Sequence, residues 1–144
     1  MNWDYVGGFF DGEGSAFLSA HRREDCKSHY HFRPNLKITQ RRNRAILQAI
    51  RDFLGVGWIG SSGRNGESEQ WSIVGAKQCL MIIPELRAHV ILKARPLELL
   101  EEACHIVAKR NGYSPQSTVV RLLQIRKELQ GLNSKKSHTQ RNPY

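Results

Sequence analysis

The sequence has only three cysteines, and their spacing excludes the usual structural roles of that residue. Cys26, Cys79 and Cys104 are far apart, odd in number and include no C-x-x-C pair. Neither a zinc site nor a disulfide framework is therefore supported. We expect reduced thiols in a reducing compartment, two of them buried in the core. The six histidines show no ligand spacing on a shared helix face, so we assign them no metal.

Long apolar runs are also missing. No segment approaches the roughly 20 apolar residues of a membrane-spanning helix. No signal peptide is expected either, because Asp4 and the glycines after it interrupt any apolar run near the N-terminus. We expect a soluble, intracellular protein with no membrane partner, cytoplasmic in a prokaryote or organellar in a eukaryote. A chain of 144 residues suits one domain with its own core.

Acidic residues are few beside basic ones. The 22 lysines and arginines against 13 aspartates and glutamates give a formal net charge of +9. Domains this basic usually have a polyanionic partner, most often a nucleic acid. The alternative is a surface charge that only keeps the protein in solution.

Residues 5–16, YVGGFFDGEGSA, are the most informative segment and predict a helix built against its own propensity. Gly7 and Gly8 each cost about 1 kcal/mol relative to alanine in a helix interior. A chain tolerates this when something must come very close to the backbone. Gly8 and Gly12 lie one turn apart on one face, with Tyr5 above them. We expect a second helix to pack on this bare stripe.

The same helix ends with two carboxylates, Asp11 and Glu13. They lie at the negative end of the helix dipole, where acidic groups are disfavoured. A close-packed pair of helices with such ends would attract a metal cation. The alternative is a capped helix followed by an ordinary glycine turn.

Helices and strands follow one another along the rest of the chain. We predict a helix over residues 3–12, strands over 15–23 and 31–41, a helix over 44–54, strands over 56–61 and 69–74, a short helix over 76–82, a helix over 96–109 and a last helix over 114–130. Asn43 caps and Gly55 ends the second helix, Pro84 lies in a loop, and Gly131 ends the last helix.

This order predicts an α+β fold of the form αββαββα with further C-terminal helices. Two hairpins would build one four-stranded antiparallel sheet, which the helices cover. We place this domain at residues 1–131. Residues 132–144 form a polar, basic tail that we expect to be mobile unless it contacts DNA.

The strand over residues 31–41 alternates between a polar, basic face and an apolar one. One face of an antiparallel sheet can stay in water, and a two-stranded ribbon fits the major groove of DNA. The expected DNA contacts are Ser19, His21, Arg23, His31, Arg33, Asn35, Lys37, Thr39, Arg41, Gln70 and Ser72. A face that is only solvated would mix charges of both signs, whereas this one has scarcely an acid.

RNA is a rival partner for a basic sheet. A sheet that binds RNA usually exposes aromatic residues on which bases stack. We expect Phe32, Trp58 and Trp71 on the buried face instead, so the sequence favours duplex DNA.

The segment Val6 to Gly14, VGGFFDGEG, resembles the LAGLIDADG motif of the homing endonucleases. Its second half, DGEG, is in register, whereas Val6 and Gly7 stand where the motif has Leu and Ala. Further likeness lies in the runs ITQRRNR at residues 38–44 and LGVGW at residues 54–58. The resemblance covers roughly residues 3–110. Length and element order are similar to the single-motif members, which work as homodimers.

The resemblance implies the LAGLIDADG fold and a Mg²⁺-dependent (or Mn²⁺-dependent) endonuclease. It would make double-strand breaks in a pseudo-palindromic DNA site on the order of 20 bp. Glu13 would bind the metal with the carbonyl oxygen of Gly12, although most members have Asp at that position. Gln40, Arg44 and Lys93 would act near the scissile phosphates. Tyr5, Gly8 and Gly12 would form the homodimer interface.

Several alternatives remain open within this resemblance. Asp11 points about 200° away from Glu13 on the helix, so we interpret it as a structural residue, the alternative being a contact to the metal. The chain could also be a DNA-binding protein without cleavage activity. It could instead be an intron RNA maturase, because some proteins of this family act on intron RNA.

Overall fold

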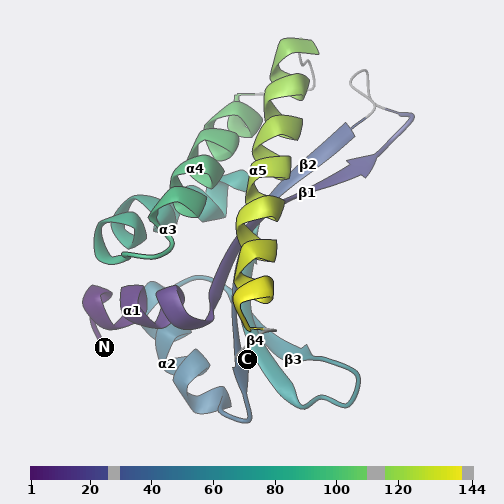
Figure 1. The fold of residues 1–144 in the computed structure, drawn as a ribbon. Coiled ribbons are helices and arrows are strands. Elements are labelled where there is room, and N and C mark those ends of the chain that lie inside the picture. The colour runs from purple at the N-terminus through teal and green to yellow at the C-terminus, as the bar shows by residue number, and fades with distance from the viewer. Residues whose placement is uncertain (26–29, 110–115, 141–144) are drawn as a thin grey trace.

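The computed structural model describes residues 1–25, 30–109 and 116–140. In the described residues the elements are α1 (Trp3–Glu13), β1 (Gly14–Arg22), β2 (Tyr30–Arg41), α2 (Arg44–Leu54), β3 (Trp58–Ser62), β4 (Ser68–Val74), α3 (Ala76–His89), α4 (Ala94–Ala108) and α5 (Gln116–Gln140) (Figure 1). This is the predicted order, αββαββα followed by C-terminal helices.

The strands form one antiparallel sheet in the order β1-β2-β4-β3. Gly14 of β1 pairs with Ile38 of β2, and Ile38 pairs with Trp71 of β4. Trp58 of β3 pairs with Ser72 of β4. The predicted four-stranded antiparallel sheet is confirmed. Figure 1 shows its two hairpins, β1–β2 and β3–β4, extending away from one another.

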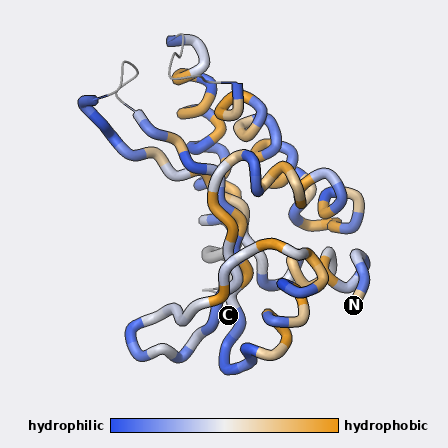
Figure 2. Tube along the Cα trace, turned by 180° about the vertical axis from the view of Figure 1, so that it is seen from behind, coloured by the Kyte–Doolittle hydropathy of each residue, from blue (hydrophilic) through white to orange (hydrophobic). Residues whose placement is uncertain are grey.

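The helices cover one face of this sheet and leave the other open. Strand residues such as Leu36, Ile38 and Trp71 are fully buried beneath Phe10 and Leu100 of the helices in one core. Hydrophobic residues follow the helices and the middle of the sheet, while hydrophilic ones occupy the outer ends of both hairpins (Figure 2). The period-two alternation seen in the sequence therefore separates the core face from the open face.

Two helix ends differ from the prediction. The prediction of a short helix over 76–82 followed by a loop at Pro84 is wrong, because α3 continues through Pro84 to His89. A proline inside a helix costs about 3 kcal/mol. On either side of it the helix buries Ile83 and Leu86, and each such side chain stabilises the fold by about 1.5–3 kcal/mol. Tertiary packing therefore offsets the local penalty.

The prediction that the last helix ends at Gly131 is wrong. α5 passes this glycine and reaches Gln140, so the expected boundary between residues 131 and 132 falls inside a helix. Leu129 is buried on one side of the glycine, and the amide of Asn133 on the other donates to the carbonyl of Ala16 in β1 at 3.4 Å. Contact with the sheet thus continues the helix beyond its expected stop. The expected start at residue 114 and the last four residues lie outside the described residues.

Cys79 and Cys104 are buried free thiols, which confirms the prediction for two of the three cysteines. A hydrogen bond with Cys79 and burial both raise the pKa of Cys104, so this thiol stays protonated. Cys26 lies outside the described residues. Within the described chain, no helix is both long and apolar enough to span a membrane.

Candidate functional site

The turn from α1 into β1 places Glu13 at the edge of the sheet without any intervening loop. Asn2 caps the helix by accepting from the N–H of Tyr5 at 2.8 Å, and Gly14 directly starts the strand. A side chain at Gly14 would collide with the ring of Phe10, which explains why glycine occupies this position. Glu13 is exposed at the junction, so its carboxylate is available to a ligand.

Asp11 uses its carboxylate inside the protein. Its oxygens accept from the backbone N–H groups of Ile91 at 2.7 Å, Leu92 at 3.0 Å and Lys93 at 3.0 Å. These donors belong to the turn that leads into α4, where unpaired N–H groups favour a negative charge. Three hydrogen bonds support the interpretation of Asp11 as a structural residue.

The same turn brings Lys93 to the motif. Its side chain is buried, with 8% of the residue exposed, and its ammonium donates to the carbonyl of Gly14 at 2.8 Å. A buried ammonium needs such a partner, because removing its hydration is costly. A positive charge is therefore fixed beside the residue that follows Glu13, although 79 positions separate Lys93 from Gly14.

An open hollow of about 630 Å³ lies at this junction. It is lined by Gly12, Glu13, Gly14, Ser15, Phe17, Thr39, Arg41, Ser68, Lys93 and Asn133. These residues come from the end of α1, the first part of β1, the end of β2, the start of β4, the residue before α4 and the distal part of α5. Asn133 was missed by sequence reasoning, because the last helix was expected to end before it.

Gln40 and Arg44, the other predicted catalytic residues, do not line this hollow. Gln40 lies two residues beyond Ile38, the partner of Gly14, at the end of the sheet where α1 ends. Arg44 opens α2 and forms an ion pair with Glu69 of β4 at 3.3 Å. The structure thus gathers Gly12, Glu13 and Lys93 around the hollow. Gln40 and Arg44 do not line it, although Gln40 lies between Thr39 and Arg41, which do.

The donor atoms at the junction suit a hard cation. Glu13 offers one exposed carboxylate, and in the described parts of the chain there is no group of three or more metal-binding His, Cys, Asp or Glu residues. Mg²⁺ binds oxygen, retains several waters and often takes only one or two carboxylates from a protein. One Glu13 with the neighbouring Gly12 carbonyl fits that requirement, whereas a zinc site does not fit.

The open face of the sheet has the predicted polar residues. Register places Ser19, His21, His31, Arg33, Lys37, Thr39, Arg41, Gln70 and Ser72 on this face, and Arg23 just beyond β1. Asn35 lies there too but is buried, because its amide donates to the Arg33 carbonyl at 2.7 Å and to the Ser19 hydroxyl at 3.2 Å. Its nitrogen is thus already used within the protein.

One acid contacts this basic face, which the sequence reading did not anticipate. Glu67 pairs with Arg41 at 3.5 Å, whereas the Arg44–Glu69 pair lies on the other side of the sheet, because Glu69 is the cross-strand partner of Gln40. Both arginines are well exposed, so these pairs contribute little to stability. A phosphate group could replace the exposed Glu67 carboxylate at small cost.

The prediction that Trp58 lies on the buried face is wrong. Phe32 and Trp71 are buried as expected, but Trp58 is 61% exposed. It pairs with Ser72, and the following residue, Ile59, points towards the helices. The alternation of β3 therefore turns the indole of Trp58 to the open face, a signal already present in the order Trp-Ile-Gly.

The motif glycines of α1 face two different surroundings. A side chain at Gly7 would collide with the backbone carbonyl of His89, so this glycine serves the contact between α1 and α3. A methyl group at Gly8 or Gly12 would meet open space beyond the helix itself, and Tyr5 beside them is exposed. The stripe predicted as a dimer interface is therefore bare and open in the single chain.

A family model decides the classification of the chain. The model described as LAGLIDADG endonuclease matches residues 6–101. The chain belongs to the LAGLIDADG endonuclease family. The match includes both Glu13 and Lys93, which line the hollow described above. A comparison with curated proteins gave no match.

Solved structures of other LAGLIDADG proteins have the same fold. The archaeal intron-encoded homing endonuclease I-Vdi141I, complexed with DNA, has a TM-score of 0.81 and 23% identity over 90% of this chain and 82% of its own. I-CvuI, seen with uncleaved DNA in the presence of Mg, has a TM-score of 0.78 and 21% identity over 90% and 80%. I-TnaI has a TM-score of 0.78 and 19% identity over 94% and 97%. At these identities the likeness establishes the LAGLIDADG fold.

Proposed function

We propose that this LAGLIDADG protein is a site-specific homing endonuclease that makes double-strand breaks in duplex DNA. One observation carries the proposal: the exposed Glu13 and the buried Lys93 line one hollow, beside residues of the basic, open sheet face. The face would hold the duplex, and the hollow would receive its backbone. The DNA and metal in the I-CvuI structures support the same assignment.

Each residue of the hollow would have a distinct role in phosphodiester hydrolysis. Glu13 and the Gly12 carbonyl would hold Mg²⁺ or Mn²⁺, which when bound supplies a Lewis acid and an activated water. Lys93 would stabilise the negative charge that develops on the phosphate, because its ammonium is already fixed at the Gly14 carbonyl. Gln40 and Arg44 would act from outside the hollow's lining by orienting water or the phosphate. For Arg44 this requires release from Glu69.

We propose further that the active protein is a homodimer. Each chain has one Glu13 carboxylate in its hollow, and we expect that cutting both DNA strands requires two of these carboxylates. Pairing of the open stripe of Tyr5, Gly8 and Gly12 with that of a second copy would bring both motif ends together. Twofold symmetry then implies a pseudo-palindromic site on the order of 20 bp.

Cleavage of a duplex pool that contains the uninterrupted insertion site of the gene tests the proposal. With Mg²⁺ we expect one defined product pair, and with excess EDTA we expect binding without cutting. Mn²⁺ should restore cutting. Binding without cutting under every metal condition would instead assign the chain as a cleavage-inactive DNA-binding protein.

The exposed indole of Trp58 favours one second candidate, an intron RNA maturase. RNA-binding sheets stack bases on exposed aromatic side chains, and this one was not expected on the open face. A single exposed ring among arginines and lysines is a weaker signal than the two or three of typical RNA-binding sheets. Competition between intron RNA and the duplex at equal salt separates the two: preference for the RNA would reject the nuclease.

A further inference from the structure

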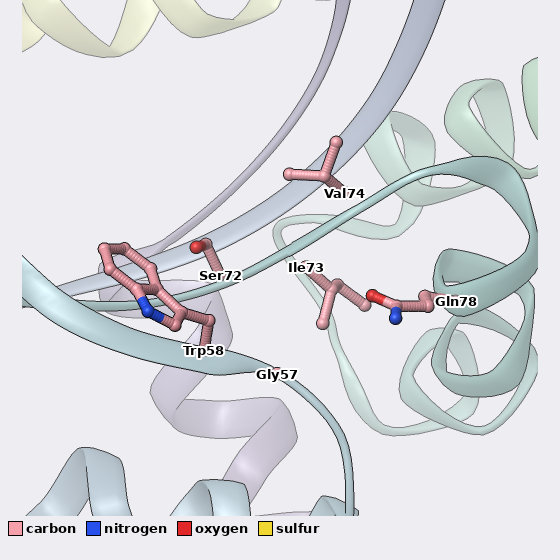
Figure 3. A pocket seen from close by; sticks show the side chains of 6 residues that line it. All are labelled: Gly57, Trp58, Ser72, Ile73, Val74 and Gln78. Atoms are coloured by element: carbon pink, nitrogen blue, oxygen red, sulfur yellow. The ribbon is translucent and has the colours of Figure 1, made fainter.

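An apolar patch interrupts the polar open face on the β3 side of the sheet. Trp58 is 61% exposed and Val74 is 45% exposed, with Ser72 between them. Figure 3 shows these three side chains rising on the same side of the sheet, while Ile73 points to the other side. These three residues line a hollow of about 390 Å³ together with Gly57, Ile73 and Gln78 of α3, so the hollow reaches past the end of β4 towards the helices. Two exposed apolar side chains around one hollow, rimmed by polar residues, mark a candidate interaction site.

The indole is held in place before any ligand arrives. A side chain at Gly60 would collide with the ring of Trp58, so the ring lies against the bare backbone two residues along β3. Just before it, Gly57 has a φ of +114° and packs against the ring of Trp71, whose Nε1–H donates to the Val56 carbonyl at 3.0 Å. The Gly60 backbone thus covers part of the indole of Trp58, while 61% of the residue remains exposed. A fixed ring loses little conformational entropy on binding.

The surroundings of the patch point to nucleic acid rather than to an apolar protein surface. Ser72 is paired across the sheet with Lys37, and Gln70 with Thr39, so the patch continues directly into the basic face. Arg33 and Arg41 lie on the same face of the neighbouring strand. A partner that covers Trp58 must therefore also accept several cations. Duplex DNA meets both conditions.

In the major groove, the one methyl group on the base edges is the 5-methyl group of thymine. Cytosine has only a hydrogen atom at that position, and the polar groups of the other base edges are hydrogen-bond donors and acceptors that an apolar side chain would leave unpaired. We propose that Trp58 and Val74 form an apolar contact that recognises the methyl group of a thymine in each half-site. This proposal rests on the proposed function and adds one determinant of its specificity.

Selection of cleaved sites from a randomised duplex pool is the first test. We expect the natural protein to select thymine at one symmetric pair of positions. Trp58→Ser should lose the preference for thymine at these positions and keep the preferences at all other positions. Trp58→Phe, which retains an apolar ring, should keep the preference for thymine. Met81→Ser, which alters an exposed apolar residue on α3, is the matched control and should select the same site as the natural protein.

Removal of a single methyl group from the DNA makes the test more specific. Deoxyuridine in place of that thymine removes only the methyl group and should weaken binding about fourfold, the effect of one buried methyl-sized group. Trp58→Ser should be insensitive to this replacement. Circular dichroism of each variant checks the fold, and at an exposed position we expect it unchanged.

The outcomes separate the two proposals. If Trp58→Ser weakens every duplex equally and deoxyuridine has no effect, the indole contacts the backbone and recognition of thymine is wrong. If the natural protein selects a site that has no thymine at any symmetric pair of positions, recognition of thymine is also wrong, whereas the proposed endonuclease function is retained. If the natural protein neither binds nor cuts any duplex in the pool, the proposed function itself fails.

Discussion

At the scale of single residues, Asp11 and Glu13 show how two carboxylates two positions apart acquire different roles. Asp11 is enclosed by the N–H groups before α4, whereas Glu13 projects from the helix end into the hollow. The helix geometry predicted that they point in different directions. The partners of Asp11 could not be predicted, because they lie about 80 residues away and depend on tertiary packing.

Asp11→Asn should destabilise the protein by about 1–3 kcal/mol, because an amide cannot replace a carboxylate that accepts three backbone hydrogen bonds. Urea unfolding followed by circular dichroism measures this. Asp25→Asn removes only an exposed pair with Arg23 and serves as control, with an expected change within about 0.5 kcal/mol. Equal stability of the two variants would contradict the role of Asp11.

Adjacent glycines of the motif should respond in opposite directions to the same substitution. Gly7→Ala places a methyl group against the His89 backbone and should destabilise the chain by about 1–3 kcal/mol. Gly8→Ala faces open space and should stabilise the isolated chain by up to about 1 kcal/mol through helix propensity. Thermal unfolding at concentrations that keep the chain monomeric checks both. A loss of stability at Gly8 would show that this position is packed within the chain.

At the scale of elements, helix ends were predictable where the terminating signal is local. Asn43 caps α2 by accepting from the N–H of Ile46, and Gly55 ends it with a φ of +72°, both as the sequence indicates. Pro84 and Gly131 gave the same kind of signal and were overridden by packing of α3 and α5. A breaker residue therefore sets a cost, and burial of its neighbours decides whether the helix continues.

The bare stripe of α1 is the element on which dimerisation depends. Gly8→Leu should abolish self-association and cleavage together, because a large side chain prevents close approach of a second helix. Analytical ultracentrifugation and the cleavage assay read out the two effects. Full cleavage by a monomeric Gly8→Leu protein would refute the dimer.

The basic face should give DNA binding a steep dependence on salt. Lys37→Ala, which removes a cation in the middle of this face, should reduce the slope of log K against log salt by about 1. Lys77→Ala on α3 is a control that alters an exposed lysine outside the face and should leave the slope unchanged. Equal slopes for Lys37→Ala and the natural protein would place DNA elsewhere.

At the scale of the whole molecule, the two hairpins, the four-stranded antiparallel sheet and the helical layer were predicted from the strand periodicity and the element order. The pairing of β2 with β4, which joins the hairpins, was not predicted. The hollow was not predicted either. It depends on Lys93 reaching Gly14 and on Asn133 reaching Ala16, contacts that join segments 79 and 117 positions apart. Of Lys93 and Asn133, only Lys93 was a site candidate in the sequence. It is a charged residue directly after the apolar residues 90–92, and the family resemblance implied a role for it near the phosphates.

Glu13→Gln compared with the natural protein in paired binding and cleavage assays tests the central claim most directly. Loss of a metal-binding carboxylate should lower the single-turnover cleavage rate at least about 100-fold while leaving the Kd for the duplex within about threefold. Glu24→Gln, at an exposed acid beyond β1, should match the natural protein in both assays. Cleavage by Glu13→Gln at the natural rate would contradict the account, because the hollow would then not be the catalytic centre.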